Sequence, residues 1–191
     1  MGDLEVTRVY DAIKEHEDVL GELRALALEI LRAASLIAGA LESGRKLLLC
    51  GNGGSSADAQ HIAAELVGRF ARERKALPAI ALNENSAVLT ALGNDYGFER
   101  VFARQVEALG ESGDVLMAFS TSGKSQNVLL ACEAARSKGL YVLGLTGREG
   151  GDLRDRCHLC LCVPSRNTAR IQEMHILIGH ILCELVERAL C

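Results

Sequence analysis

LLLCGNGGSSADAQHIAAELVGRF, residues 47–70, combines three features in one stretch. A run of apolar residues typical of a short buried strand ends at a glycine-rich turn, and a segment with helical periodicity follows. This segment carries His61 and Glu65 four residues apart, so the two side chains lie about 40° apart around the helix and project together. Glycine and serine at a strand end are typical of phosphate binding, whereas His and Glu on one helical face indicate metal binding or proton transfer.

The chain beyond this stretch repeats the alternation of short apolar strands and helices. Further strands are expected at 78–82, 114–120, 140–147 and 157–163, and the last helix at about 168–190. Continuous apolar strands separated by helices predict a parallel sheet that is covered on both faces. We therefore expect an α/β fold, a three-layer α/β/α sandwich, in one domain that spans residues 1–191.

The first 43 residues read as helix up to a break at Gly44, and we predict an N-terminal helical hairpin. Within it, LALEILRAASLIAGAL (residues 26–41) carries more apolar positions than one amphipathic stripe needs. A helix that is apolar nearly all round is buried. Since the sheet can cover only one side, we expect residues 1–43 to contact other subunits.

Composition excludes several classes of partner. The net charge of −4 gives no general attraction to nucleic acid or anionic membranes, and 4% aromatic residues without Trp disfavour stacking on single-stranded nucleic acid. No targeting segment and no apolar run of about 18 residues is visible. We expect a cytoplasmic protein without nucleic-acid or membrane partners.

Seven cysteines are interpreted as reduced thiols, because the number is odd and the chain is not small. CHLCLC at 157–162 contains a C-x-x-C spacing that is also found in zinc sites. No second C-x-x-C pair completes such a site, and the segment reads as a short apolar strand in which Cys acts as a small hydrophobe.

Two strand ends are rich in groups that bind anions, CGNGGSS (50–56) and FSTSGKS (119–125). The first is not the dinucleotide motif G-x-G-x-x-G, because its last position is Ser56. The second is not a nucleotide-hydrolysing P-loop, because Ala118 stands where that loop needs glycine. Ordinary caps and turns would explain one such loop. Two loops at neighbouring strand ends favour a phosphate monoester, bound by the hydroxyl groups of Ser120, Thr121, Ser122 and Ser125.

The last helix contributes Gln172 and His180, which lie eight residues and about 80° apart and can share one broad face. His175 falls about 140° from His180 and is the weaker candidate. Two His, one carboxylate and one amide make a plausible tetrahedral set for Zn²⁺. Any one of these residues alone would be read as a hydrogen-bonded helix side chain.

Five segments together resemble the sugar isomerase (SIS) superfamily, and within it most closely the phosphoheptose isomerases. They are CGNGGSSADAQHIAAEL (50–66), LTALGNDYGF (89–98), FSTSGKSQNVL (119–129), LTGREGG (145–151) and TARIQEMHILIGH (168–180). The resemblance implies an α/β/α fold, a cytosolic homotetramer, zinc in the active site, and conversion of sedoheptulose 7-phosphate to D-glycero-D-manno-heptose 7-phosphate. That conversion is the first step of ADP- or GDP-heptose synthesis for bacterial lipopolysaccharide.

The resemblance also implies roles for individual residues. Aldose–ketose isomerisation moves a proton between C1 and C2 and needs a base and an acid, for which Glu65 and His180 are the candidates. The implied metal ligands are His61, Glu65, Gln172 and His180. The implied substrate contacts are Asn52, Gly53, Gly54, Ser55, Glu65, Asn94, Asp95, Ser120, Thr121, Ser122, Ser125 and Gln172. Arg69, one turn after Glu65, reads equally well as an anion contact or a surface arginine.

Two other functions compete with the enzyme. A noncatalytic SIS adaptor that binds the bacterial replication initiator would lack the full metal and acid–base set, and here all four positions are filled. A sugar-phosphate sensor is usually fused to a DNA-binding helix-turn-helix, and no such module is visible in these 191 residues.

Overall fold

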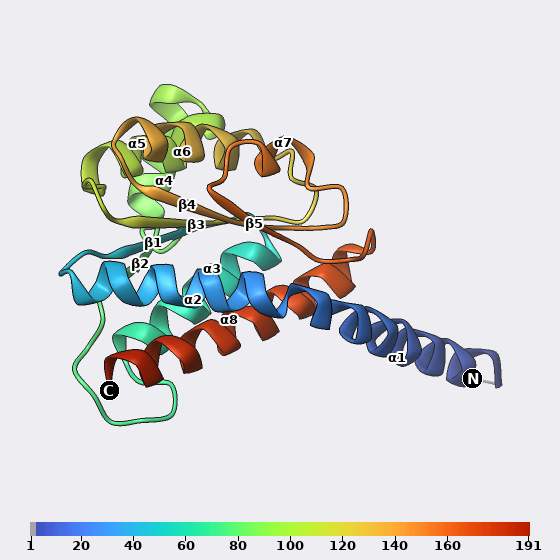
Figure 1. Cartoon of the computed structure of the whole chain (residues 1–191). Coiled ribbons are helices and arrows are strands. Elements are labelled where there is room, and N and C mark those ends of the chain that lie inside the picture. The colour runs from blue at the N-terminus through green and yellow to red at the C-terminus, as the bar shows by residue number, and fades with distance from the viewer. Residues whose placement is uncertain (1–2) are drawn as a thin grey trace.

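Five strands at the expected positions form one parallel sheet in the computed structural model, which describes residues 3–191 (Figure 1). The strands lie in the order β2-β1-β3-β4-β5. Their bounds are Leu47–Cys50 (β1), Ala79–Ala81 (β2), Val115–Ser120 (β3), Tyr141–Thr146 (β4) and Leu159–Cys162 (β5). Every pairing is parallel, as the continuous apolar runs predicted.

Strand β1 shows why these runs are apolar at every position. All four of its residues are buried. Leu47 and Leu49 face one hydrophobic cluster, and Leu48 and Cys50 face a second cluster on the other side of the sheet. Because side chains alternate across a strand, a sheet with helices on both faces leaves no position for a polar residue.

Helices cover both faces and complete the predicted α/β/α layers (Figure 1). One face is covered by α2 (Ala27–Glu42), α3 (Gly54–Val67) and α8 (Thr168–Leu190). The other face carries α4 (Ser86–Tyr96), α5 (Val101–Leu109), α6 (Gln126–Ser137) and the short α7 (Gly151–Arg154). Across residues 3–191, no helix is both long enough and apolar enough to cross a membrane.

The N-terminal region is helical as predicted, but the expected hairpin is wrong. Helix α1 (Asp3–Leu23) runs through a short 3₁₀ turn (Arg24–Leu26) directly into α2. Leu23 and Ala27 both keep right-handed helical backbone angles, so the chain does not reverse. Figure 1 shows α1 projecting beyond the sheet domain as an arm. This arm exposes apolar side chains, including those of Leu4, Val9, Tyr10 and Ile13.

The strand order places a ligand crevice between β1 and β3. The chain leaves β1 toward α3 on one face and leaves β3 toward α6 on the other (Figure 1). Such a switch in direction opens a crevice at the carboxyl ends of the two strands, where open α/β sheets bind ligands. Both glycine-rich loops predicted to bind phosphate border this crevice.

Candidate active site

The first glycine-rich loop is tied to the start of α6 by a pair of amides. Asn52 donates from Nδ2 to Asn127 Oδ1 over 2.8 Å, and Asn127 donates from Nδ2 to Asn52 Oδ1 over 2.9 Å. Asn127 is buried, and sequence reasoning did not select it. Its only signal was its place two residues after Ser125, at the start of the second helix. The amide pair holds the two loops that border the crevice in a fixed relation.

Helix α3 begins at Gly54 directly after this loop, and Gly53 caps it with a φ of 57°. The side chain of Ser55 is buried below the turn. Gly54 has a packing role of its own, since a Cβ at this position would lie 2.5 Å from Gln172 Nε2. Only glycine allows the amide of Gln172 to approach the loop so closely.

The second loop presents its hydroxyl groups at the start of α6. Ser120 and Ser125 share a hydrogen bond of 2.9 Å between their hydroxyl oxygens, and Ser122 Oγ accepts the Lys124 amide over 3.2 Å. Gly123 has a φ of +66°, and a Cβ there would lie 2.0 Å from the carbonyl oxygen of Gly150. The loop is therefore packed tightly against the loop that follows β4.

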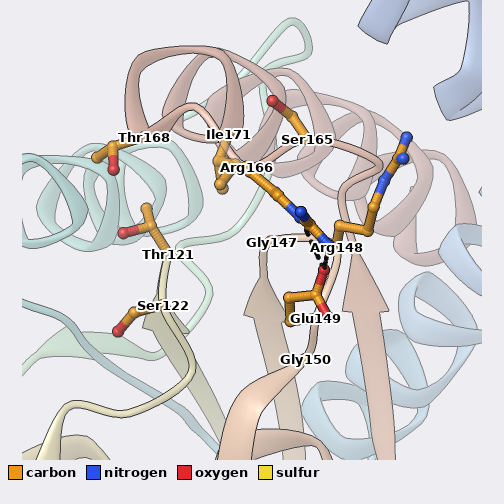
Figure 2. A pocket seen from close by; sticks show the side chains of 10 residues that line it. All are labelled: Thr121, Ser122, Gly147, Arg148, Glu149, Gly150, Ser165, Arg166, Thr168 and Ile171. Carbon is orange, nitrogen blue, oxygen red and sulfur yellow. Dashed lines mark hydrogen bonds and ion pairs between the residues drawn. The ribbon is translucent and has the colours of Figure 1, made fainter.

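A pocket opens between this loop, the loop after β4 and the start of α8. Figure 2 shows Thr121 and Ser122 on one side of the pocket and the ion pair of Arg166 with Glu149 on the other. The shortest distance in that pair is 2.7 Å between Arg166 Nη2 and Glu149 Oε1. Arg148 also lines the pocket, but its guanidinium donates to the Pro164 carbonyl oxygen over 2.8 Å. Sequence reasoning assigned no site role to this third loop.

Helices α3 and α8 bring His61, Glu65 and His180 together. His61 Nε2 lies 3.2 Å from Glu65 Oε1 and 3.3 Å from His180 Nε2. These two histidines are 119 residues apart in the chain. Phe70 covers the cluster from one side, with its ring 5.6 Å from that of His180.

The three donor atoms fit the coordination sphere of a small divalent metal. Ligands that hold zinc at about 2.0–2.1 Å in a tetrahedron are about 3.3 Å apart, which matches both measured spacings. Among residues 3–191, these three form the group of His, Cys, Asp or Glu side chains that can share one ion. The geometry therefore supports the predicted metal position for His61, Glu65 and His180.

Gln172, the fourth predicted metal ligand, lies elsewhere in the single chain. Its amide rests against Gly54, which is seven residues, or about 10 Å of helix, away from His61. The structure thus brings Gln172 to the first glycine-rich loop, near the predicted substrate contacts. Its role as a metal ligand stays a prediction.

Two further titratable residues lie on the same two helices, α3 and α8. Asp58 lies one turn before His61 on α3, and burial raises the pKa of its carboxyl to about 6, partly offset by His61. One of its oxygens, Oδ2, has no hydrogen-bond partner among residues 3–191. His175 faces the core, where burial lowers its pKa to about 4 against an opposing hydrogen bond to the Thr146 carbonyl oxygen. Sequence reasoning did not select Asp58, and its ranking of His175 below His180 stays a prediction.

The remaining predicted contacts lie near the end of α4 and just after α3. Asn94 and Asp95 are exposed near the end of α4 and bond to each other over 2.7 Å. Arg69 is an exposed arginine whose Nε lies 3.7 Å from Glu73 Oε2. Contacts of these residues with substrate stay predictions.

The arrangement separates two tasks along α3. Both glycine-rich loops lie at the strand ends, and the His–Glu–His cluster lies two to three turns of α3 beyond the first of them. A phosphorylated sugar has its phosphate at one end of the carbon chain and its carbonyl at the other. The site can therefore hold the phosphate at the loops and expose the reacting carbons to a carboxylate and imidazoles.

Comparisons with known proteins agree with this geometry. A family model described as SIS domain matches residues 13–147. A phosphoheptose isomerase of Nitratiruptor sp. is 56% identical over 176 residues, which cover 92% of each chain. A phosphoheptose isomerase of Burkholderia pseudomallei is 48% identical over 193 residues, covering 100% of this chain and 98% of that protein.

Solved structures give the same result. The phosphoheptose isomerase of Francisella tularensis superposes with a TM-score of 0.94 at 41% identity, covering 98% of this chain and 100% of the other. That of Neisseria gonorrhoeae superposes with a TM-score of 0.91 at 44% identity, covering 95% of this chain and 98% of the other. The similarity therefore includes α8, which lies beyond the residues matched by the family model.

Proposed function

Because the chain belongs to the SIS domain family and, within it, to the phosphoheptose isomerases, we propose that it interconverts sedoheptulose 7-phosphate and D-glycero-D-manno-heptose 7-phosphate. It is an aldose–ketose isomerase. The close relatives are named as isomerases, so the adaptor hypothesis finds no support among them. The observation that carries the proposal is the convergence of His61, Glu65 and His180, two of which lie on the helix that follows the first glycine-rich loop.

Proton transfer is assigned to two side chains of the cluster, Glu65 and His180. Glu65 takes the proton from C1 of the ketose and returns it to C2, while His180 donates to the carbonyl oxygen and later recovers a proton from the adjacent hydroxyl. The enediol between these steps needs both groups within reach of neighbouring carbons. The hydroxyl groups of Ser120, Thr121, Ser122 and Ser125 hold the phosphate at the far end of the sugar.

Zinc is the metal we propose for the cluster, held by His61, Glu65 and His180 and, by resemblance, Gln172. Bound there, it would stabilise negative charge on the substrate oxygens and lower nearby pKa values. The first glycine-rich loop is proposed to contact the sugar through Asn52, Gly53, Gly54 and Ser55. Asn94 and Asp95 are further proposed sugar contacts.

Assembly and location are proposed on separate grounds. The exposed apolar side chains of α1, together with Leu28 and Leu31 on α2, leave a surface that a second copy of the chain would cover. A homotetramer is the form that the resemblance implies, and closed symmetry suits it. We place the reaction in the cytoplasm, as a step toward the activated heptose of bacterial surface polysaccharide.

The decisive experiment follows product formation from sedoheptulose 7-phosphate with and without a metal chelator. Glu65→Gln keeps the shape of the side chain but removes its basicity, and should lower kcat by about 10²–10⁴-fold. Glu73→Gln, which changes an exposed carboxylate on the following loop, is the matched control. Zinc content and folding are measured in each variant, because Glu65 is also a proposed ligand. If zinc-loaded wild-type protein converts no heptose phosphate, the proposed reaction is wrong.

A further inference from the structure

A buried ion pair lies next to the site but takes no part in the proposed chemistry. Arg74 follows the end of α3, and Glu187 lies on the last turns of α8. The distance from Arg74 Nε to Glu187 Oε1 is 3.0 Å, and the two side chains are only 3% and 2% exposed. Pairs of this kind are weak evidence of stability, because apolar residues often replace them without loss. Stability alone therefore does not explain why this ion pair is buried here.

Glu187 acts as an anchor for the chain segment that leaves α3. Its carboxylate accepts hydrogen bonds from the backbone amides of Phe70 (3.1 Å), Ala71 (2.9 Å) and Arg72 (2.9 Å) in addition to the one from Arg74. Burial works to raise the pKa of Glu187, but the three amides and the Arg74 charge outweigh it and hold the pKa below its usual value. The carboxylate therefore stays ionised and keeps all four partners.

Arg74 closes the carboxyl end of α3. Its Nη2 donates to the carbonyl oxygen of Glu65 over 2.9 Å, and its Nη1 donates to that of Leu66 over 2.9 Å and of Gly68 over 3.2 Å. The carbonyl groups of Glu65 and Leu66 belong to the last turn of α3 and lack partners within the helix, and Gly68 is the residue that follows it. The guanidinium thus joins the backbone of Glu65 to a carboxylate on α8.

Glu187 and Arg74 each connect to one member of the proposed acid–base pair, Glu187 to His180 and Arg74 to Glu65. Glu187 lies seven residues after His180, or about 20° around the helix, and so on the same side of α8. Phe70, whose amide Glu187 holds, packs its ring on that of His180. On the other helix, Arg74 is bonded to the main chain of Glu65 itself.

We propose that Arg74 and Glu187 are positioning residues for the isomerisation, which clamp α3 to α8 so that Glu65 and His180 keep the spacing that proton transfer and metal binding need. The inference rests on the proposed function of that pair. A displacement of about 1 Å at reacting groups can cost about 10²-fold in rate. Second-sphere groups of metal sites change metal affinity by about 10–100-fold. Removing the clamp should therefore lower the rate and the metal affinity of the site, even though neither residue touches substrate.

The test uses Glu187→Gln, which keeps the side-chain shape but turns an NH₂ group toward donors. We expect kcat to fall by about 10–100-fold and KM to change by less than about threefold, because the phosphate loops are untouched. Zinc affinity, measured by competition with a chromophoric chelator, should fall by a similar factor. Amide exchange should accelerate at residues 70–72. Glu133→Gln, which breaks the exposed ion pair with Arg156 in another layer, is the matched control.

Arg74→Lys covers the case in which Glu187→Gln does not fold. Lysine keeps the charge opposite Glu187, but its single ammonium group cannot replace the separate N–H donors that Arg74 directs at Glu187 and at the carbonyl groups of α3, so it should show the same losses in smaller measure. A folded variant with faster exchange at 70–72 but unchanged kcat and zinc affinity would show that the pair is merely structural and overturn the proposal. Wild-type protein without isomerase activity would instead contradict the proposed reaction. In that case, a loss of zinc affinity in Glu187→Gln would still support the clamp.

Discussion

Replacing Gly54 by Ala would test whether Gln172 serves the substrate from its place at the first loop. The new methyl group would lie 2.5 Å from Gln172 Nε2, whereas ordinary contacts begin at 3.4 Å. The amide must therefore withdraw by about 1 Å, which a flexible side chain can do at a cost of about 1 kcal/mol. The backbone N–H of residue 54 is retained, so only the position of Gln172 changes.

The effects on stability and on activity should separate. Alanine is favoured over glycine in a helix by up to about 1 kcal/mol, so the free energy of unfolding should stay within about 1 kcal/mol of wild type. A displacement of this size at a substrate contact should lower kcat/KM by about 10–100-fold. Urea unfolding and steady-state kinetics with sedoheptulose 7-phosphate measure the two quantities.

Gly39→Ala on α2 is the matched control, because a Cβ there meets nothing within 4 Å. It should leave activity unchanged. Wild-type kinetic constants in folded Gly54→Ala protein would refute the reasoning, because Gln172 would then have no role that depends on its position beside Gly54.

Four further predictions follow from the same geometry. Metal analysis of protein purified without chelator should find about one zinc per chain, and an active enzyme that stays metal-free would contradict this. Thr121→Val should raise KM for the phosphorylated sugar by about 10-fold with little change in kcat, since one hydrogen bond to a charged phosphate is lost; an unchanged KM would move the phosphate elsewhere. His175 has a folded pKa of about 4, below its ordinary 6.5, so the unfolded chain takes up the proton first and stability is lost as pH falls from 6.5 toward 4. Between pH 7 and pH 5 this loss should reach about 2 kcal/mol in urea unfolding and be absent in His175→Phe; equal pH slopes would speak against it. Sedimentation at micromolar concentration should show a tetramer that Tyr10→Asp with Ile13→Asp weakens, and a wild-type monomer would remove the proposed assembly.

Local patterns in the chain were sufficient for the layers and for part of the site. Strands such as 47–50 and 115–120 are recognisable because a doubly covered sheet requires unbroken apolar runs. The partnership of His61 with Glu65 follows from helical period alone. The hairpin failed for a related reason. Apolar periodicity is the same whether two successive helices fold back or run on, and the junction at Arg24–Leu26 carries no residue that forces a reversal.

Contacts between distant segments could not be obtained in this way. His180 meets His61 across 119 residues, and Arg74 meets Glu187 across 113, because α3 packs on α8 at one angle and register. That packing depends on the shapes of many side chains at once, whereas periodicity reports only which face of each helix is apolar. The same packing places Gln172 against Gly54, about two turns of α8 away from His180. The sequence alone thus determines the kinds of groups that the site contains, and the packing of the helices decides which of them meet.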